Sequence, residues 1–314
     1  IDKAIERYLG ELDRADEVFE QTRTVLPEAR MERTLRKLEH LQKEALRYRS
    51  MEQRMDETGE TQVSFSDPDA RSMATTARMS RIVGYNVQTA VEADNHLIVA
   101  HEVTMLGFDR GALSMMAEAA NDVMTTDQLT AIADKGYYKG EEIVASEEAG
   151  ISVVVPKPMT SNAAARGQFD KADFAYDNVE DVYNCPAGER LIYRFTGQQD
   201  GKAIRSYWSG ACADCAIKDK CTTSKERRVR RWEKEDVLDR VQARMDADPA
   251  QLAVRSMTVE HPYGTIKSWM GATHFKMRTL KNVATEMALH VLAYNMTRVM
   301  NIMGIPAVIA AMKA

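Results

Sequence analysis

The sequence predicts an α/β protein with a mixed sheet at its core, and three observations support this prediction. Apolar and polar residues alternate over 84–104 as they do in a β-hairpin. Two short apolar strands follow, at 129–134 and 152–156, and helical spacing precedes each of them, at 110–124 and 139–149. The order hairpin, helix, strand, helix, strand is typical of a mixed sheet with helices packed on it.

The composition excludes several classes of protein. Of the 314 residues, 44% are hydrophobic and 28% charged, which is enough apolar material for a core and argues against wholesale disorder. No window approaches the ~18 uninterrupted apolar residues of a membrane span, and no signal peptide is visible. The net charge of −5 argues against a nucleic-acid-binding function. It does not exclude one, because local basic patches can coexist with an acidic total.

The N-terminal region has the pattern of two charged helices. Apolar residues recur at helical spacing in both stretches, with Pro27 between them. This pattern predicts a helical hairpin over 1–58, which is either a solvated structural arm or a surface for a partner. Residues 58–83 are rich in Ser and Thr, contain Asp67-Pro68-Asp69, and are predicted to form a loop.

The second half of the chain changes character twice. Between 160 and 225 the content of Gly, Ser, Asn and Asp rises and all four cysteines occur, which indicates an insertion with a small β-structure of its own. From about 233 helical spacing returns, mainly at 233–247, about 250–271 and 279–303. We therefore divide the chain into a helical hairpin arm, a first part of the core, a Cys-containing insertion and a helical C-terminal part of the core, at 1–58, 59–159, 160–230 and 231–314.

One acidic residue stands where ligands often bind. The motif ADKGYY places Asp134 at the carboxyl end of an apolar strand, just before Gly136. Ligands of open α/β sheets gather at such strand ends. An ionised carboxylate there needs a partner, and a divalent cation would serve. Capping of the turn that follows explains the position equally well.

A second carboxylate, Glu260, is predicted to lie at the start of a helix. Pro262 is tolerated in a first helical turn, and the helix dipole favours a Glu there. Lys267 would lie two turns further on, nearly on the same face, and Arg255 lies five residues before Glu260. The group is either a functional carboxylate flanked by two cations or an ordinary surface ion-pair cluster. His261 is either an assistant at this site or a structural hydrogen-bonding residue.

The four cysteines form another candidate site. Cys212 and Cys215 have the spacing that lets two thiolates bind one metal ion from a single turn, and Cys221 and Cys185 can complete a tetrahedral zinc site. The alternative is a set of reduced thiols in a small insertion. Because no secretory signal is visible, a disulfide framework is less expected.

A basic stretch, KERRVRRWEK over 225–234, contains six basic and two acidic residues. Such a stretch can follow DNA phosphates even in an acidic protein, although a solvated basic face is the plain alternative. The candidate phosphate contacts are Arg227, Arg228, Arg230, Arg231, Arg255 and Lys267.

Several motifs, taken in order, resemble one family. DPDARSM and GYNVQTAVEADNHLIVAHEV are followed by ADKGYYKGEEI, YNCPAGERL, a C-x2-C-x5-C set, VEHPYGTIKSWMG and ALHVLAYNMTRVMNIMG. From about Asp67 to Gly304 this ordered set is similar to the DDE transposases of bacterial insertion sequences, in the branch with a cysteine-bearing insertion before the final Glu. The helical hairpin is compatible with that family.

The resemblance implies an RNase H-like core in which Asp, Asp and Glu hold two Mg²⁺ ions for DNA cleavage and strand transfer. Asp134 matches the second Asp, Glu260 the Glu, and Lys267 a basic residue expected to touch DNA phosphate. Arg255 stands near the family's Arg, with one residue more before the Glu than is usual, and Leu252 stands where the family has a Tyr. The resemblance also implies a bacterial cytoplasmic protein, active as a homo-oligomer on transposon ends and target DNA, with no membrane contact.

The first Asp of the family pattern has no match in the sequence. The family carries it on the first core strand in an Asp-Gly-Ser or Asp-Gly-Thr context, and neither tripeptide occurs here. Asp67, Asp69, Asp94 and Asp109 stand in other contexts, and none is assigned this role. We therefore expect the first strand and its Asp to precede Ile1. The alternatives are an inactive transposase-derived remnant that binds DNA or a protein, and a different metal-dependent nuclease.

Overall fold

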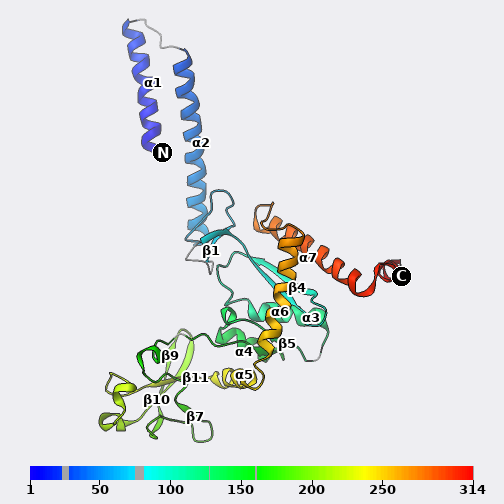
Figure 1. Ribbon diagram of the computed structural model, residues 1–314. Helices are drawn as coiled ribbons and strands as arrows, with labels where there is room; N and C mark the ends of the chain where they lie inside the picture. Colours follow the sequence, from blue (N-terminus) through cyan, green and yellow to red (C-terminus); the bar gives the residue numbers. More distant parts are fainter. Residues whose placement is uncertain (23–27, 75–80, 127, 160, 314) are drawn as a thin grey trace. The chain divides into compact units, whose positions relative to one another are not determined.

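The computed structural model describes residues 1–22, 28–74, 81–126, 128–159 and 161–313 (Figure 1). The chain forms two compact units. The first comprises Ile1–Tyr85 with Met277–Val283, and the second comprises Asn86–Lys276 with Ala284–Ala314. Both units contain helices and strands, which confirms the predicted mixture of α and β structure. None of the described helices combines the length and apolarity needed to span a bilayer.

The first unit begins with the predicted helical hairpin. Helices α1 (Asp2–Thr22) and α2 (Glu28–Thr58) lie side by side and run in opposite directions (Figure 1). On α2, Leu38, Ala45 and Met51 are buried while most of the surface is exposed and charged. Gly59, in the left-handed region at φ 68°, follows the last helical residue as a C-terminal cap. Pro27, which was predicted to separate the helices, lies outside the described residues.

The predicted loop over 58–83 is wrong in part, because it contains a small antiparallel ladder. Strand β1 (Arg71–Ala74) pairs with β2 (Arg81–Gly84), and Arg71 lies opposite Gly84. Each strand has only four residues, too few for an alternating pattern to stand out from the Ser- and Thr-rich surroundings. Residues 75–80, which belong to that predicted loop, lie outside the described residues.

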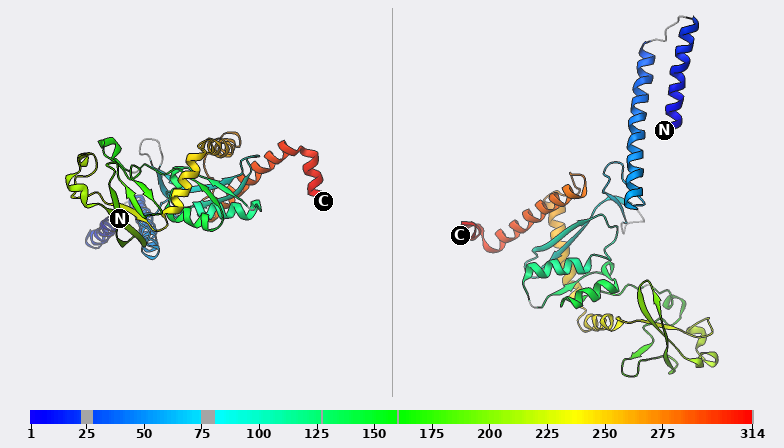
Figure 2. Two further views of the ribbon diagram at one scale, coloured as in Figure 1. Left: turned by 90° about the horizontal axis from the view of Figure 1, so that it is seen from below. Right: turned by 180° about the vertical axis from the view of Figure 1, so that it is seen from behind.

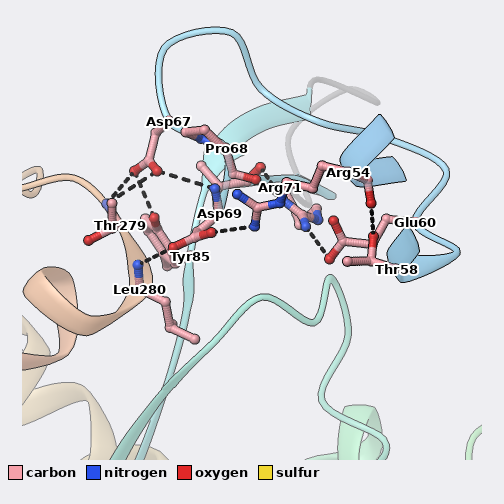
Figure 3. Close-up of polar contacts among 11 residues, drawn as sticks. Arg54, Thr58, Glu60, Asp67, Pro68, Asp69, Arg71, Tyr85, Thr279 and Leu280 are labelled. Atoms are coloured by element: carbon pink, nitrogen blue, oxygen red, sulfur yellow. Dashed lines mark hydrogen bonds and ion pairs between the residues drawn. The ribbon is translucent and has the colours of Figure 1, made fainter. Parts of the chain in front are cut away.

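Two aspartates of the first unit cap a helix that is distant in sequence (Figure 3). The backbone N–H of Thr279 donates to both carboxylate oxygens of Asp67, each at 3.2 Å, and that of Leu280 donates to Asp69 Oδ2 at 2.8 Å. These N–H groups stand at the start of α7 (Leu280–Met303), where four backbone donors lack helical acceptors. The Tyr85 hydroxyl donates to Asp67 at 2.7 Å, and Arg54 pairs with Asp69 at 2.6 Å. The segment Asp67-Pro68-Asp69 is therefore a structural clamp on the start of α7.

Replacing Asp67 by Ala should destabilise the first unit by about 1–3 kcal/mol, because the part-buried Thr279 N–H and Tyr85 hydroxyl lose their acceptor. Asp67 is only 8% exposed, so water cannot easily replace the carboxylate. Thermal unfolding followed by circular dichroism measures the change, with the exposed Asp56→Ala on α2 as the control. Equal melting temperatures for the two variants would contradict the clamp.

The stability that the clamp provides should also depend on pH. The hydrogen bond from Arg54 lowers the pKa of Asp69 below its usual range, and the Leu280 N–H acts in the same direction. The contribution of Asp69 to stability is therefore fully present above about pH 4, the usual Asp pKa, and is lost as the pH falls through the lowered value.

The second unit contains the predicted hairpin and two further strands. Strand β3 (Asn86–Val91) pairs antiparallel with β4 (Ile98–Thr104). Helix α3 (Leu113–Met124), strand β5 (Thr130–Ile132), helix α4 (Gly140–Glu148) and strand β6 (Ser152–Val154) follow, and β5 and β6 run parallel. The predicted order of hairpin, helix, strand, helix and strand is confirmed. The predicted mixed sheet is not, because these described strands form two separate ladders, one antiparallel and one parallel.

The strands of this core lie between two helical layers. Helices α3 and α4 lie on one side, and α6 (Gln251–Gly264) lies on the other (Figure 2). The apolar centre joins α3, α4, β6 and α5 (Glu235–Ala247) through Leu113, Ala133, Ile143, Val153, Val155 and Val241. Of these strands, β5 and β6 are short and mainly apolar, whereas β3 and β4 alternate between apolar and polar residues.

The two ladders of this core are separated by a cavity. Among the described strands, β3 pairs only with β4, and β5 only with β6. A cavity of about 340 Å³ lies between them, and we call it the inter-ladder cavity. Its walls come from β3, β5, α3 and α6, chiefly Ala90, Val91, Ala131, Ile132, Met116, Ala117, Ala120, Val254, Thr258 and Val259. The facing edges of β3 and β5 thus present backbone groups to a largely apolar space.

The insertion forms its own sheet, as predicted. Strands β7 (Ala175–Asp177), β8 (Val182–Asn184), β9 (Arg190–Gln199), β10 (Lys202–Trp208) and β11 (Val229–Trp232) make a five-stranded antiparallel sheet in sequence order. Its core consists of Phe174, Tyr183, Leu191, Tyr207 and Val229.

The helices near the C-terminus differ from the prediction at their ends. The predicted helix over 250–271 is α6 followed by a π-helical turn, Thr265–Trp269, and a further helix, α8 (Ile305–Lys313), was not predicted. Glu260 therefore lies near the end of α6 and not at the start of a helix. The earlier Pro249 stands just before α6 and marks its beginning, whereas Pro262 lies inside the helix close to the π-helical turn.

Candidate active site

Asp134 lies at the carboxyl end of β5 and begins a short 3-10 helix, Lys135–Tyr137. Its Oδ1 accepts a hydrogen bond of 2.7 Å from the backbone N–H of Gly136, so the capping interpretation is correct. Its Oδ2 accepts from Arg255 Nη2 at 3.1 Å, and 44% of the side chain remains exposed. The carboxylate thus caps its own turn and still presents an oxygen outward.

Gly136 is required by close approach at this turn. A Cβ atom there would lie 2.9 Å from Asp134 Oδ1 and 3.5 Å from Asp109 Oδ2. A side chain at 136 would therefore displace the Asp134 carboxylate from its present position. The same distances place a second carboxylate, Asp109, next to Asp134. The sequence interpretation gave Asp109 no role, because its position before a helix is equally typical of a helix start.

Arg255 reaches Asp134 across 121 positions of sequence. It belongs to α6, which packs on β3 and β5. Helical geometry places Glu260, five residues later, about 140° around the helix from Arg255. The predicted cluster in which Arg255 and Lys267 flank Glu260 is therefore wrong, because Arg255 pairs with the other carboxylate.

Glu260 is exposed, and its Oε1 accepts a 3.0 Å hydrogen bond from Ser256 Oγ one turn earlier. Lys267 lies in the π-helical turn with its ammonium 5.5 Å from the ring centre of Tyr263. Tyr263 fixes α6 on β3, because its hydroxyl donates to the Val87 carbonyl at 2.8 Å. Across the described ranges, no three His, Cys, Asp or Glu side chains are arranged to hold a metal ion.

His261 has the structural role that the sequence left open. Its Nδ1 lies 2.9 Å from the Tyr294 hydroxyl, which donates to the His96 carbonyl at 2.7 Å. Burial lowers the pKa of His261, and Arg298 and His96 act in the same direction. The ring is therefore neutral near pH 7 and links α6 to α7.

The four cysteines surround one small cavity of about 30 Å³ in the insertion. Cys185 and Cys221 also pack against the aromatic core of the sheet, and burial raises the pKa of the Cys221 thiol. All four thiols are free and half-buried. The fold thus gathers the four residues, although their arrangement here is not that of metal ligands.

The predicted basic stretch divides between surface and interior. Arg228 and Arg230 are exposed, and Arg228 also lies 4.8 Å from the Trp208 ring centre. The half-buried Arg227 lies 5.2 Å from the ring centre of Phe174. Together they line an open cavity of about 540 Å³ with Lys225.

Arg231 differs from its neighbours, because it is only 7% exposed. Its guanidinium pairs with Asp239 at 2.7 Å and lies 3.8 Å from the Tyr176 ring centre. Its side chain therefore joins the insertion to α5 and does not belong to the exposed basic surface.

Part of this region matches a known family. Residues 184–300 match the family model of a transposase DDE domain. We call residues 184–300 the transposase-like segment, and they cover a little over a third of the chain. The segment includes Arg255, Glu260, Lys267 and all four cysteines, but not Asp134. Comparison with curated proteins and with solved structures gave no match. The match supports a relationship to the DDE transposases, a family of polynucleotidyl transferases that act on DNA with divalent metal ions.

Proposed function

We propose that the chain is the catalytic part of a DDE transposase, which cleaves DNA at the ends of an insertion sequence and transfers the strand to a target. The observation that carries this proposal is the pairing of Asp134 with Arg255. Arg255 belongs to the transposase-like segment, and Asp134 lies outside it at the carboxyl end of a core strand. The pair thus joins the two parts of the chain that the family resemblance assigns to one site.

Asp134 and Glu260 are the residues we propose to hold Mg²⁺. Carboxylate oxygens are the ligands that Mg²⁺ prefers in proteins. When bound, the ions activate water or a DNA 3′-hydroxyl and stabilise the leaving oxygen. The two carboxylates do not by themselves complete such a site in the described part of the chain. We propose that the remaining carboxylate arrives on another strand, which the inter-ladder cavity is suited to accept.

The inter-ladder cavity supports an RNase H-like core with one strand still to be added. A strand placed there would find unpaired backbone edges on β3 and β5 and apolar helices above and below. Central strands of a covered sheet are bounded in this way on all four sides. We propose that the first strand of the family pattern, with its Asp, occupies this cavity and so lies beside β5, the strand that ends at Asp134.

Around this centre, basic side chains would bind phosphate. Arg255 holds the outer oxygen of Asp134 and so orients this carboxylate before metal or DNA arrives. Lys267, exposed in the π-helical turn, and the exposed Arg228 and Arg230 are the proposed contacts to the DNA backbone. We propose that the protein works as a homo-oligomer on paired DNA ends in the bacterial cytoplasm.

The function is tested with a supercoiled plasmid that carries both ends of the encoding element. The proposal expects nicking and strand joining with Mg²⁺ and neither with EDTA. DNA binding without cleavage, by the protein with its upstream strand present, would favour an inactive remnant. Cleavage without joining to a target would favour a nuclease on the same fold.

We also propose a structural zinc site at the four cysteines, because the fold brings all of them to the lining of one small cavity. Purified protein should contain about one Zn²⁺ per chain, and Cys212→Ser should lose it, since each thiolate is one of four ligands. Elemental analysis after gel filtration measures this, with the exposed Thr223→Ala as the control. A folded, zinc-free protein would show instead that the cysteines are reduced thiols.

A further inference from the structure

A buried amide connects Asp109 to the turn that carries Asp134. Gln88, on β3, is only 2% exposed, so both ends of its amide need partners inside the protein. Its Nε2 donates to Asp109 Oδ1 at 2.7 Å, and its Oε1 accepts from the Tyr137 hydroxyl. Because a carboxylate only accepts, the NH₂ group must face Asp109, and the carbonyl must then face Tyr137. The hydrogen bonds therefore run in one direction, from the Tyr137 hydroxyl to Gln88 and from Gln88 to Asp109.

Tyr137 remains a donor throughout the neutral pH range. Burial raises the pKa of its hydroxyl above the usual Tyr value, and the carboxylates of Asp109 and Asp134 act in the same direction. Tyr137 is the last residue of the 3-10 helix that Asp134 caps. The turn is therefore held at its start by Asp134 itself and at its end by Gln88.

Asp109 is held in turn by two residues of β3. The Asn86 Nδ2 donates to Asp109 Oδ1 at 2.8 Å, and Gln88, two residues further on, donates to the same oxygen. Residues two apart lie on one face of a strand. Asp109 Oδ2 is the oxygen that faces Gly136. Asp109 thus contacts both β3 and the turn after β5, although these two strands share no backbone ladder in the described sheets.

We propose that Asp109 is a positioning residue for Asp134, acting through Gln88 and Tyr137. This inference rests on the proposed function only for its consequence in catalysis. Its structural part is that the hydrogen bonds of Asp109 set the order of the Asp134 turn. A loose turn would misplace the carboxylate, and a misplacement of about 1 Å can lower a rate about 10²-fold.

Two variants of Asp109 separate hydrogen bonding from charge. Asp109→Asn keeps the Oδ1 acceptor for Asn86 and Gln88 but removes the charge, whereas Asp109→Ala removes both. Hydrogen–deuterium exchange of the segment 133–139 should rise about 10-fold in the Ala variant and stay near the parent value in the Asn variant. The exposed Asp122→Ala on α3 is the control. Unchanged exchange in Asp109→Ala, with the fold intact, would overturn the proposal.

The catalytic consequence has a separate readout. Cleavage of the plasmid should fall about 10–100-fold in Asp109→Ala and return to within about 3-fold of the parent in Asp109→Asn. An Asn variant as inactive as the Ala variant would overturn the positioning role and make the charge of Asp109 the requirement. A parent protein that orders the turn as described but cleaves no DNA would refute the proposed function and leave the exchange result standing.

Discussion

Asp134→Asn and Glu260→Gln should each lower Mg²⁺-dependent DNA cleavage by about 10³-fold or more, which corresponds to at least ~4 kcal/mol of transition-state stabilisation. Each amide keeps the shape of the side chain and an oxygen to accept the bond from Gly136 or from Ser256. Both variants lose the negative charge that a metal ion requires, and Asp134→Asn also loses the ion pair with Arg255. Plasmid nicking at several Mg²⁺ concentrations measures the effect, in a protein extended by the proposed first strand.

DNA binding should survive in both variants, because neither residue is a proposed phosphate contact. Asp94→Asn is the matched control, since Asp94 is an exposed carboxylate in the hairpin turn between β3 and β4. Cleavage within about 10-fold of the parent in either variant would remove that residue from the catalytic set. The test is sharpest for Glu260, whose role rests on the motif VEHPYGTIK and whose carboxylate contacts Ser256 alone among the hydrogen bonds described here.

Filling the inter-ladder cavity should stabilise the 314-residue chain and destabilise a protein extended by the proposed first strand. Ala117 on α3 is 5% exposed and lines the cavity. In the 314-residue chain, Ala117→Leu adds apolar volume to open space and should stabilise by about 1–2 kcal/mol, because each buried CH₂ contributes about 0.8 kcal/mol. In a protein extended by its upstream strand, the same side chain would overlap that strand and should cost about 1–3 kcal/mol.

Thermal unfolding of both proteins tests this reversal. The expected shifts are a few degrees upward in the 314-residue chain and a few degrees downward in the extended protein, at about 2–4 °C per kcal/mol. Ala119→Leu, on the same helix but outside the cavity lining, serves as the control. A shift of the same sign in both lengths would show that no strand enters the cavity.

The local pattern of the sequence was enough for most of the core. Alternation over 84–104 predicted β3 and β4, and the apolar runs before Asp134 and Pro156 predicted β5 and β6. The buried faces of these elements are apolar, so apolar residues recur in the sequence with a period that indicates a helix or a strand. The ladder of β1 and β2 leaves no such trace, because each of its strands has only four residues.

The relations between distant residues could not be predicted in this way. Arg255 was assigned to Glu260 because the two are near in sequence, yet the fold pairs it with Asp134. Arg231 was assigned to DNA with its basic neighbours, yet strand alternation turns it inward to Asp239. Asp109 and Gln88 gave no signal at all, because their importance depends on β3 lying next to the turn after β5. Hydrogen bonds across a fold depend on topology, which one sequence does not display.

The proposed metal site is tested most directly by mapping where a metal ion binds on the protein itself. Fe²⁺ substituted for Mg²⁺, with ascorbate and peroxide, cuts the polypeptide next to the bound ion, and mass spectrometry identifies the cuts. In a protein extended by the proposed first strand, we expect cuts beside Asp134 and Glu260, and their disappearance in Asp134→Asn. Cuts confined to other regions, or a pattern that Asp134→Asn leaves unchanged, would contradict the proposed site.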